Sequence, residues 1–528
     1  MRASTVKTAL SGIFLIGMAA GCKVPGPGEA VSRRPNILFV ITDDQSYPHA
    51  AAYGEKVFKT PAFDKIAERG VLFSNAFVAA PQCSPSRAAI LTGRNIWQLE
   101  EAGTHSSYFP SKFPVFTDAL EASGYAVAYT GKAWGPGNWR DSGWPRNPVG
   151  KEHNDQRFEE VPYAGISKVD YAANFKSFLD EKPGDKPFFF WFGAFEPHRV
   201  YEYGSGRRSG LDERDLELPD FLPEHDSIVN DVLDYALEIS WADQQLEKML
   251  GYLEESGALE NTIIVMTADN GMAFPHAKAN LQEFGIHVPL AICGPSIKGN
   301  RKVDDLVSLI DLGPTFLEIA GAKKMDGVTG QSLLPLLQGE GLGDVDRARK
   351  YILAGRERHT HARPHNTGYP ARAIRTEEFL FIKNFRPERW PVGDPPPKDQ
   401  VPDPSDPDLN AIVDGYEDID ASPTKDVMLN QRQEWPELFR IAFEKRPDEQ
   451  LYDIKADPGC LKDLSSDERY ANVLKEVREQ LVSELKKEGD PRVTGTGDVF
   501  DSYPRFGRMR LFEGFRARGE YNAAFRER

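Results

Sequence analysis

Short apolar runs that alternate with helical patterns restrict the fold of this chain more than any other feature. The runs at 37–41, 125–129, 188–192 and 263–266 consist of apolar and aromatic residues only. Strands of this kind are buried on both faces, which is typical of a parallel sheet with helices on both sides. We therefore predict an α/β fold with a large mixed, mostly parallel sheet flanked by helices.

Helix signals lie between these runs. Thr60-Pro61 has the residue types of a helix N-cap and first helical position, and Gly70 marks the far end. A second helix is indicated by apolar residues at three- and four-residue spacing that stop near position 257. These residues are Ile239, Ala242, Leu246, Leu250 and Leu253.

The residue pattern changes near Arg347, where a second part of the chain begins. Short apolar runs at 351–354 and 379–383 and a helical pattern at 470–486 predict a smaller C-terminal α+β domain over 346–489, after a larger domain over 35–345. Residues 391–424 are rich in proline and aspartate and predict a long surface loop. Residues 490–528 form a C-terminal extension without clear periodicity, for which we predict no element.

The first 22 residues have the pattern of an export signal. Basic residues precede an apolar run at 9–20, which is too short for a stable membrane span. The run ends at Ala19-Ala20-Gly21-Cys22, which resembles a bacterial lipoprotein box, and residues 23–34 form a Pro/Gly-rich tether. The resemblance implies an exported periplasmic or cell-surface lipoprotein that meets the membrane only through a lipid on Cys22. Ordinary cleavage, with Cys22 incidental, is the alternative.

Charge and cysteine content exclude two classes of protein. The chain has 64 Lys and Arg against 80 Asp and Glu, a net charge of −16, whereas a general nucleic-acid binder needs a basic surface. An anionic ligand would therefore have to be bound in a local pocket. Four cysteines, at positions 22, 83, 293 and 460, are too few for a scaffold built on disulfides.

Charged and polar residues follow the predicted strands. The residues after the four runs are Asp43-Asp44, Lys132, His198 and Asp269-Asn270. Ligands collect at the carboxyl ends of parallel strands, so these groups converge if the strands are neighbours. Carboxylate and amide oxygens favour calcium or magnesium over zinc. Each residue taken alone could be a helix cap or a loop residue, but four strand ends in agreement favour a site.

Cys83 stands at the start of a predicted helix, in the segment Cys83-Ser84-Pro85-Ser86-Arg87. Proline in the first turn predicts the helix N-terminus, so the cysteine lies where backbone N–H groups and Arg87 favour an anion. The pattern Cys-x-Pro-x-Lys/Arg arises by chance in roughly 4% of chains of this composition. A buried structural cysteine, or a thiol nucleophile with His198 as its base, is the alternative.

This segment, continued by Leu91-Thr92-Gly93-Arg94, resembles the signature of the formylglycine-dependent sulfatases. Residues 35–44, 267–271, 311–315 and 451–464 are similar to other landmarks of that family, so the resemblance covers nearly the whole chain after the tether. It implies an alkaline-phosphatase-like sulfatase fold. It also implies that a maturase oxidises Cys83 to Cα-formylglycine, whose aldehyde hydrate attacks the sulfur of a sulfate ester.

The resemblance also gives roles to individual residues. One Ca²⁺ would be bound by Asp43, Asp44, the modified Cys83, Asp269 and Asn270. Contacts with formylglycine or sulfate are implied for Arg87, Lys132, His198 and Lys278. Positive groups in this position would stabilise the charge that develops on the sulfate, and a histidine would donate a proton to the leaving group.

Within the family, the chain is most similar to the heparan N-sulfatases (sulfamidases), through residues 195–199, 269–281 and 369–385. This likeness goes with our prediction that Trp134, His359 and Arg372 bind substrate. It also implies an enzyme that removes a sulfate ester or a sulfamate from a sulfated glycan during polysaccharide or glycosaminoglycan degradation.

One position departs from the family pattern. The usual Gly-Lys-x-His reads Gly131-Lys132-Ala133-Trp134 here, so a histidine that contacts formylglycine is missing. Either another group such as His105 or His276 replaces it, or the release of sulfate is altered. Trp134 could equally stack on a sugar ring.

Two other functions remain open from the sequence. A phosphodiesterase or phosphonate hydrolase of the same superfamily could share the formylglycine site. Alternatively, a surface lipoprotein could bind sulfated glycans without turnover, if Cys83 is never matured or Trp134 disables the site.

Overall fold

The larger sheet of the computed structural model has nine strands among the described residues, which are Met1, 34–184, 186–395 and 415–506. These strands are β1 (Asn36–Thr42), β2 (Val71–Phe77), β3 (Ala126–Gly131), β4 (Lys151–Glu152), β5 (Phe188–Gly193), β6 (Thr262–Ala268), β7 (His287–Cys293), β8 (Arg301–Val303) and β9 (Val307–Ser308). They lie in the order β4-β3-β5-β1-β6-β7-β2-β8, and β9 pairs with β2. Among the described strands of this sheet, only β7 runs antiparallel to its neighbours, which are β6 and β2. The predicted mixed, mostly parallel sheet is confirmed.

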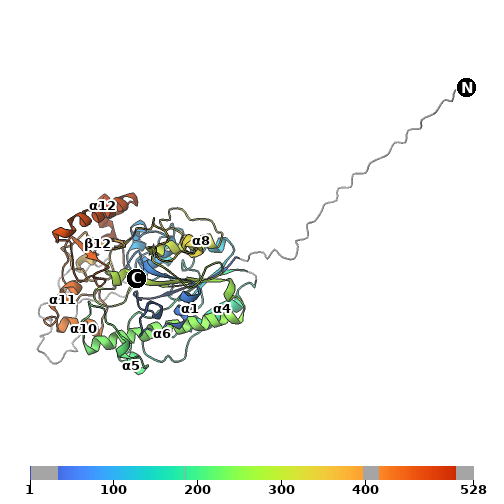
Figure 1. Ribbon diagram of the computed structural model, residues 1–528, viewed down its shortest axis with the longest axis horizontal. Helices are drawn as coiled ribbons and strands as arrows, with labels where there is room; N and C mark the ends of the chain where they lie inside the picture. Colours follow the sequence, from blue (N-terminus) through green and yellow to red (C-terminus); the bar gives the residue numbers. More distant parts are fainter. Residues whose placement is uncertain (2–33, 185, 396–414, 507–528) are drawn as a thin grey trace. The chain divides into compact units, whose positions relative to one another are not determined.

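Helices cover both faces of this sheet, because successive side chains of a strand point to opposite sides. In β1, Phe39 belongs to one buried core and Leu38 to the other. The Phe39 core includes α2 (Cys83–Thr92), α3 (Phe116–Ala122) and α8 (Leu312–Ile319), and the Leu38 core includes α1 (Pro61–Arg69), α4 (Tyr171–Glu181) and α6 (Asp226–Glu255). Figure 1 shows α8 on one side of the sheet and α1, α4 and α6 on the other.

A smaller antiparallel sheet follows in the C-terminal part. Its strands, in order, are β10 (Tyr351–Arg356), β11 (Ala371–Thr376), β12 (Phe379–Asn384) and β13 (Glu449–Asp453). Helix α12 (Ala471–Lys487) packs against β11 and β12 and buries Val477, Leu481 and Leu485. The predicted strands at 351–354 and 379–383 and the predicted late helix are therefore present. Both sheets belong to one compact unit that begins at Arg34, so the boundary at 345/346 stays a prediction.

Shorter helices complete the described chain. They are α5 (Ser205–Arg208), α7 (Glu283–Ile286), α9 (Leu334–Gln338), α10 (Pro423–Asn430), α11 (Pro436–Phe443) and α13 (Pro491–Thr494). The prediction of no element after residue 489 was wrong, because α13 forms there. Asp490 caps this helix by accepting a hydrogen bond from the backbone N–H of Arg492 (2.9 Å). Within the described residues, no helix combines the length and apolar character that a membrane span requires. The predicted lipoprotein box and tether lie outside the described residues except for Arg34.

The start of α1 shows how the sheet and helices are joined. Thr60 occupies the predicted cap position, but its hydroxyl accepts from the Ala51 N–H (2.9 Å) rather than from the helix. The cap comes from α6 instead, where fully buried Asp243 accepts from the backbone N–H groups of Ala62 (2.8 Å) and Phe63 (2.9 Å). A carboxylate at this position satisfies two otherwise unpaired donors and faces the positive end of the helix.

We expect Asp243→Ala to lower the free energy of unfolding by about 2–3 kcal/mol, because two buried N–H groups lose their acceptor. The matched control is Glu247→Ala on the same helix, where an exposed pair with Lys65 (3.0 Å) is lost. An exposed pair of this kind contributes less than about 1 kcal/mol. Urea unfolding measures both changes, and equal losses in the two variants would contradict the capping role.

Candidate active site

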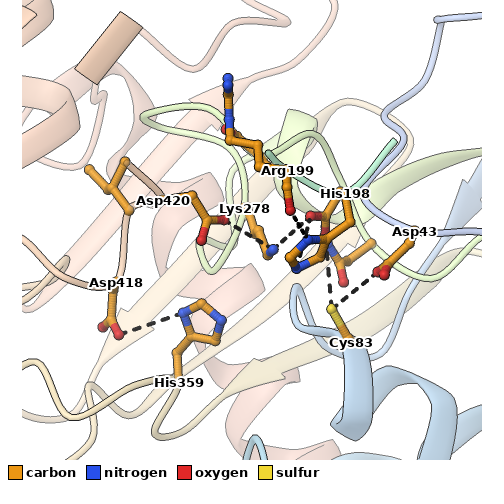
Figure 2. A network of polar contacts seen from close by, with 12 residues as sticks. Asp43, Cys83, His198, Arg199, Lys278, His359, Asp418 and Asp420 are labelled. Carbon is orange, nitrogen blue, oxygen red and sulfur yellow. Dashed lines mark hydrogen bonds and ion pairs between the residues drawn. The ribbon is translucent and has the colours of Figure 1, made fainter. Parts of the chain in front are cut away.

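The carboxyl ends of four neighbouring strands meet at one edge of the large sheet. The strands β3, β5, β1 and β6 are adjacent, so the residues that follow them are brought together as predicted. At the end of β3, Gly131 has a φ of 75°, and a Cβ atom there would lie 2.0 Å from the carbonyl oxygen of Gly193. Glycine is therefore required where the chain turns to present Lys132. Figure 2 shows Asp43, Cys83, His198 and Lys278 pointing toward one another.

Three buried carboxylates and a thiol form the centre of this group. Potential ligand atoms of Asp43, Asp44, Cys83 and Asp269 all lie within 4.8 Å of one another. The Cys83 thiol donates to Asp43 Oδ1 at 3.3 Å, and the Asp44 N–H donates to Asp269 Oδ1 at 3.2 Å. None of the four residues is more than 1% exposed. Buried carboxylates at this density require compensating positive charge.

Asn270 adds a fifth polar side chain, and one of its atoms lacks a hydrogen-bond partner in the described part of the chain. Its amide nitrogen donates to Asp44 Oδ1 (2.7 Å), whereas its buried Oδ1 has no hydrogen-bond partner among the described residues. A buried amide oxygen without a donor is costly unless a ligand is bound there. The set of carboxylate and amide oxygens therefore fits a hard cation such as Ca²⁺.

Cys83 is the first residue of α2, as the sequence predicts, and every residue of that helix is buried. Burial and the negative charge of Asp43 raise the pKa of the Cys83 thiol well above its usual range. A cysteine nucleophile acts as a thiolate, so this environment disfavours the alternative of a thiol nucleophile with His198 as base.

Three cations compensate the carboxylates. Arg87 donates from Nε to Asp269 Oδ2 (2.7 Å) and from Nη1 to the carbonyl oxygen of Lys132 (2.7 Å). The ammonium of Lys132 contacts Asp43, and it lies 4.0 Å from Asp269 Oδ2. Burial alone would raise the pKa of Asp43, but Lys132, His198 and Arg87 hold it well below its usual range. Arg87 thus positions a carboxylate and a strand end as well as supplying charge.

Lys278 is the third of these cations and connects the site to the C-terminal part. Its ammonium lies 2.6 Å from Asp44 Oδ2 and 3.1 Å from Asp420 Oδ2. The two carboxylates overcome the effect of burial and raise the pKa of Lys278 well above its usual range. Figure 2 shows Asp420 beside Lys278, on the side away from Cys83.

His198 is the most accessible member of the group, with a side chain 38% exposed. Its Nδ1 lies 2.6 Å from the carbonyl oxygen of Arg199, which can only accept, so Nδ1 carries a proton. Its Nε2 therefore faces the cluster, 4.0 Å from Asp44 Oδ2. The neighbouring Arg199 is held by a two-bond pair with Asp231 (2.7 and 2.8 Å) and fixes the loop that carries the histidine.

A cavity of about 790 Å³ opens beside this group. Asp43, Lys132 and His198 are among its lining residues, so the cavity adjoins the cluster that contains Cys83. Cavities of this size suit small-molecule or saccharide ligands.

The structure separates the candidates for the missing histidine. His276 is held by the backbone, with Nε2 3.0 Å from the carbonyl oxygen of Gly459, and it packs against Phe221. His105 is closer to the site: burial, His359 and the charges of Lys278 and Lys132 lower its pKa well below the usual range. Its Nδ1 donates to the carbonyl oxygen of His359 (3.2 Å), so only its other nitrogen could serve a ligand.

Trp134 and Arg372 need correction as predicted substrate-binding residues. Trp134 borders the cavity but is only 3% exposed, and its indole N–H donates to the carbonyl oxygen of Ser84 (3.1 Å), so its ring face is not free for a sugar. Arg372 is fully buried and pairs with Asp490 (2.6 Å) and Glu357 (2.8 Å). Its Nη1 donates to the carbonyl oxygens of Arg356 (3.2 Å) and Ala371 (2.9 Å), so the guanidinium is fully used within the protein, and it connects β11 to the C-terminal segment.

His359 is buried and lies beside Asp418, with 3.6 Å between Nδ1 and Oδ1 (Figure 2). It is not among the described residues that line the cavity, so its predicted contact with substrate stays a prediction. Asp418 and Asp420 were missed from the sequence, because they belong to the segment interpreted as a surface loop. Asp418 accepts from Arg356 (3.0 Å) and Arg363 (2.6 Å), and no local sequence pattern predicts these long-range contacts.

Comparison with known proteins agrees with this geometry. A family profile described as Sulfatase matches residues 35–322, which include every member of the cluster. The chain belongs to the sulfatase family. A second profile, described as N-sulphoglucosamine sulphohydrolase, C-terminal, matches residues 276–407. The family resemblance predicted from the Cys83 segment is thereby confirmed.

Relatives of this sulfatase span most of its length. An ulvan-active sulfatase of Formosa agariphila is 27% identical over 467 residues, covering 87% of this chain and 82% of the relative. Human N-sulphoglucosamine sulphohydrolase is 27% identical over 514 residues, covering 89% and 93%. A solved structure of a protein in complex with its substrate D-glucosamine-2-N,6-O-disulfate has a TM-score of 0.60 and 21% identity, covering 87% and 99%. That structural likeness supports the fold alone.

We expect chelator-treated protein to bind one Ca²⁺, and we expect Asp269→Asn and Asn270→Ala each to weaken binding by at least about tenfold, or about 1.4 kcal/mol. Asp344→Asn, which removes an exposed carboxylate elsewhere, is the control and should leave binding unchanged. Titration calorimetry measures all four proteins. Equal affinity in all of them would exclude the cluster as the cation site.

Proposed function

We propose that this sulfatase hydrolyses sulfate esters or sulfamates of a sulfated glycan, with formylglycine at position 83 and one Ca²⁺ at the carboxylate cluster. The observation that carries the proposal is the position of Cys83. It starts a buried helix, lies 3.3 Å from Asp43, and sits among Lys132, Lys278 and Arg87. A helix N-terminus surrounded by cations favours a bound anion such as sulfate.

The residues of the cluster fit both groups. Asp43, Asp44, Asp269 and Asn270 supply the oxygens for Ca²⁺, and the ion would neutralise negative charge next to the sulfate. Formylglycine would supply an aldehyde hydrate, with one hydroxyl as a nucleophile toward sulfur and a second hydroxyl through which inorganic sulfate could be released. An unmodified thiol has no second hydroxyl, so it could not complete this cycle.

The cations of the chain hold and polarise the sulfate. Lys132 lines the cavity at the cluster, and Lys278 is held at the cluster by Asp44 and Asp420. Preorganised positive groups in a site that excludes water stabilise the charge that develops on the sulfate oxygens. Because these cations are already fixed by carboxylates, little reorganisation accompanies the reaction.

His198 is placed to protonate the leaving group. Its Nδ1–H is used by the Arg199 carbonyl, so Nε2 is the atom that faces the cavity end of the cluster. When Nε2 is protonated, it can donate to a departing sugar oxygen or nitrogen.

Sulfated carbohydrates are the substrate class that the relatives favour. The curated relatives include an ulvan-active sulfatase and N-sulphoglucosamine sulphohydrolase, and the C-terminal profile is that of the latter. N-sulfoglucosamine is therefore the first sulfamate to test, beside O-sulfated sugars. We further propose export, lipid attachment at Cys22 and oxidation of Cys83 by a maturase of the host, all on the sequence patterns.

We expect Cys83→Ala to lower the rate of sulfate release by at least about a thousandfold, while leaving the thermal unfolding midpoint nearly unchanged. Cys293→Ala in β7, another buried free cysteine, is the control and should keep full activity. Ion chromatography of released sulfate and phosphate measures the result. Continued sulfate release by Cys83→Ala would place the nucleophile elsewhere, and phosphate release alone from matched esters would favour a phosphodiesterase or phosphonate hydrolase.

We expect His198→Ala to lower turnover of a sulfated or sulfamated sugar by about 10²–10⁴-fold, and turnover of an activated aryl sulfate by less than about tenfold. A good leaving group needs little protonation, whereas a sugar alkoxide or amine does. Steady-state kinetics on both substrates test this difference. Equal losses would mean that His198 binds sulfate and does not act as the acid.

A further inference from the structure

The cavity continues well beyond the groups that would hold sulfate. Its far wall is formed by residues at and after β4, among them Glu152, Asn154 and Arg157. In the sheet order β4 is the third strand from β1, and strands are spaced ~4.8 Å apart, so the β4 backbone lies ~14 Å from β1, and the side chains of Glu152 and Asn154 reach back to Tyr129 and Gly131 of β3. That distance exceeds the length of one sugar ring. The cavity therefore has room for a second sugar beside the one at the cluster.

Arg157 is the cation on this wall. Its side chain is exposed and lines the cavity, and across the described ranges it has no hydrogen bond or ion pair through its guanidinium. The arginines nearer the cluster are different, since Arg87 pairs with Asp269 and Arg199 with Asp231. An arginine without a carboxylate partner at the wall of a binding cavity is available to an anionic ligand.

Glu152 on the same wall does not neutralise Arg157. Its carboxylate accepts from the Tyr129 hydroxyl (2.8 Å) and from the Asn154 amide (3.0 Å). These bonds hold the carboxylate on the β3 side of the wall. Within the described chain, the wall therefore presents the Arg157 guanidinium without an ion-pair partner, beside a carboxylate whose hydrogen bonds are made to neutral groups.

Phe195 provides an apolar surface between the two ends of the cavity. It lies two residues after β5, three before His198, and it lines the cavity while 40% exposed. Aromatic residues within β5, such as Phe190 and Phe192, are fully buried. Packing of the core therefore does not account for an exposed phenyl ring at this position, whereas the apolar face of a sugar would cover it.

We propose that Phe195 and Arg157 form a subsite for the sugar next to the one that carries the scissile sulfate; this inference rests on the proposed sulfatase function. Phe195 packs against that second ring. Arg157 pairs with an acidic group on it, either a carboxylate or a second sulfate. The preferred substrate is then an oligosaccharide with acidic groups on adjacent sugars rather than a sulfated monosaccharide.

Competition experiments test the subsite without requiring turnover of each probe. The reporter is hydrolysis of an aryl sulfate or of N-sulfoglucosamine, whichever the wild type turns over. Three disaccharides with the same sulfated ring compete, and their second sugar is neutral, a uronate or sulfated. We expect at least one acidic probe to inhibit about tenfold more tightly than the neutral probe, and the better of the two identifies the acidic group.

Arg157→Ala should raise the inhibition constant of that acidic probe about tenfold and leave the neutral probe within about twofold. Phe195→Ala should weaken all three disaccharides. Reporter turnover should stay unchanged in Arg157→Ala, because the reporter does not reach the far wall. Arg347→Ala is the matched control and should change nothing, because Arg347 is exposed, lies outside this cavity and has no hydrogen bond or ion pair through its guanidinium among the described residues.

Two results would overturn the subsite. Equal inhibition of the wild type by all three disaccharides would show that the protein does not recognise the acidic group of the second sugar. An Arg157→Ala variant that behaves like Arg347→Ala would show that a residue other than Arg157 recognises this acidic group. Either result leaves the sulfatase function intact. If the wild type releases sulfate from neither reporter, the proposed function fails, and the subsite fails with it.

Discussion

Burial of three carboxylates at the ends of two adjacent strands is the constraint on which the rest of this structure depends. Asp43 and Asp44 follow β1, Asp269 follows β6, and none is more than 1% exposed. Charges taken out of water at this density destabilise the fold unless cations and hydrogen bonds compensate them. Arg87 and Lys132 provide that compensation from α2 and from the end of β3. The sheet order and the placement of α2 are therefore tied to the electrostatics of the site.

The C-terminal part completes the same charge balance from outside the large sheet. Asp420 contacts Lys278, and Asp418 is held by Arg356 and Arg363 next to His359. Residues far apart in the chain thus share one network (Figure 2). Both sheets belong to one compact unit and share one apolar core, and the Lys278–Asp420 contact adds a polar link between the cluster and the C-terminal part.

The convergence of the strand ends could be predicted from the sequence, because parallel strands place the residues that follow them at one edge of the sheet. The position of Cys83 at a helix start could also be predicted, because a helix start is a local pattern. The cap of α1 could not, since Asp243 reaches Thr60's position from another helix. Arg372 and Trp134 have residue types suited to sugar binding, and only the structure shows them engaged in ion pairs and packing. Contacts between side chains that are far apart in the sequence produce no regular spacing of residues, so they could not be predicted.

The identity of the group at position 83 tests the central claim most directly. The protein should be purified from the organism that encodes it, and the mass of the peptide containing Cys83 measured. Oxidation of the thiol to an aldehyde lowers that mass by about 18 Da, and the hydrate restores one water. The account predicts this loss in the active protein. A peptide that carries only the unmodified thiol, from protein that releases sulfate, would contradict it.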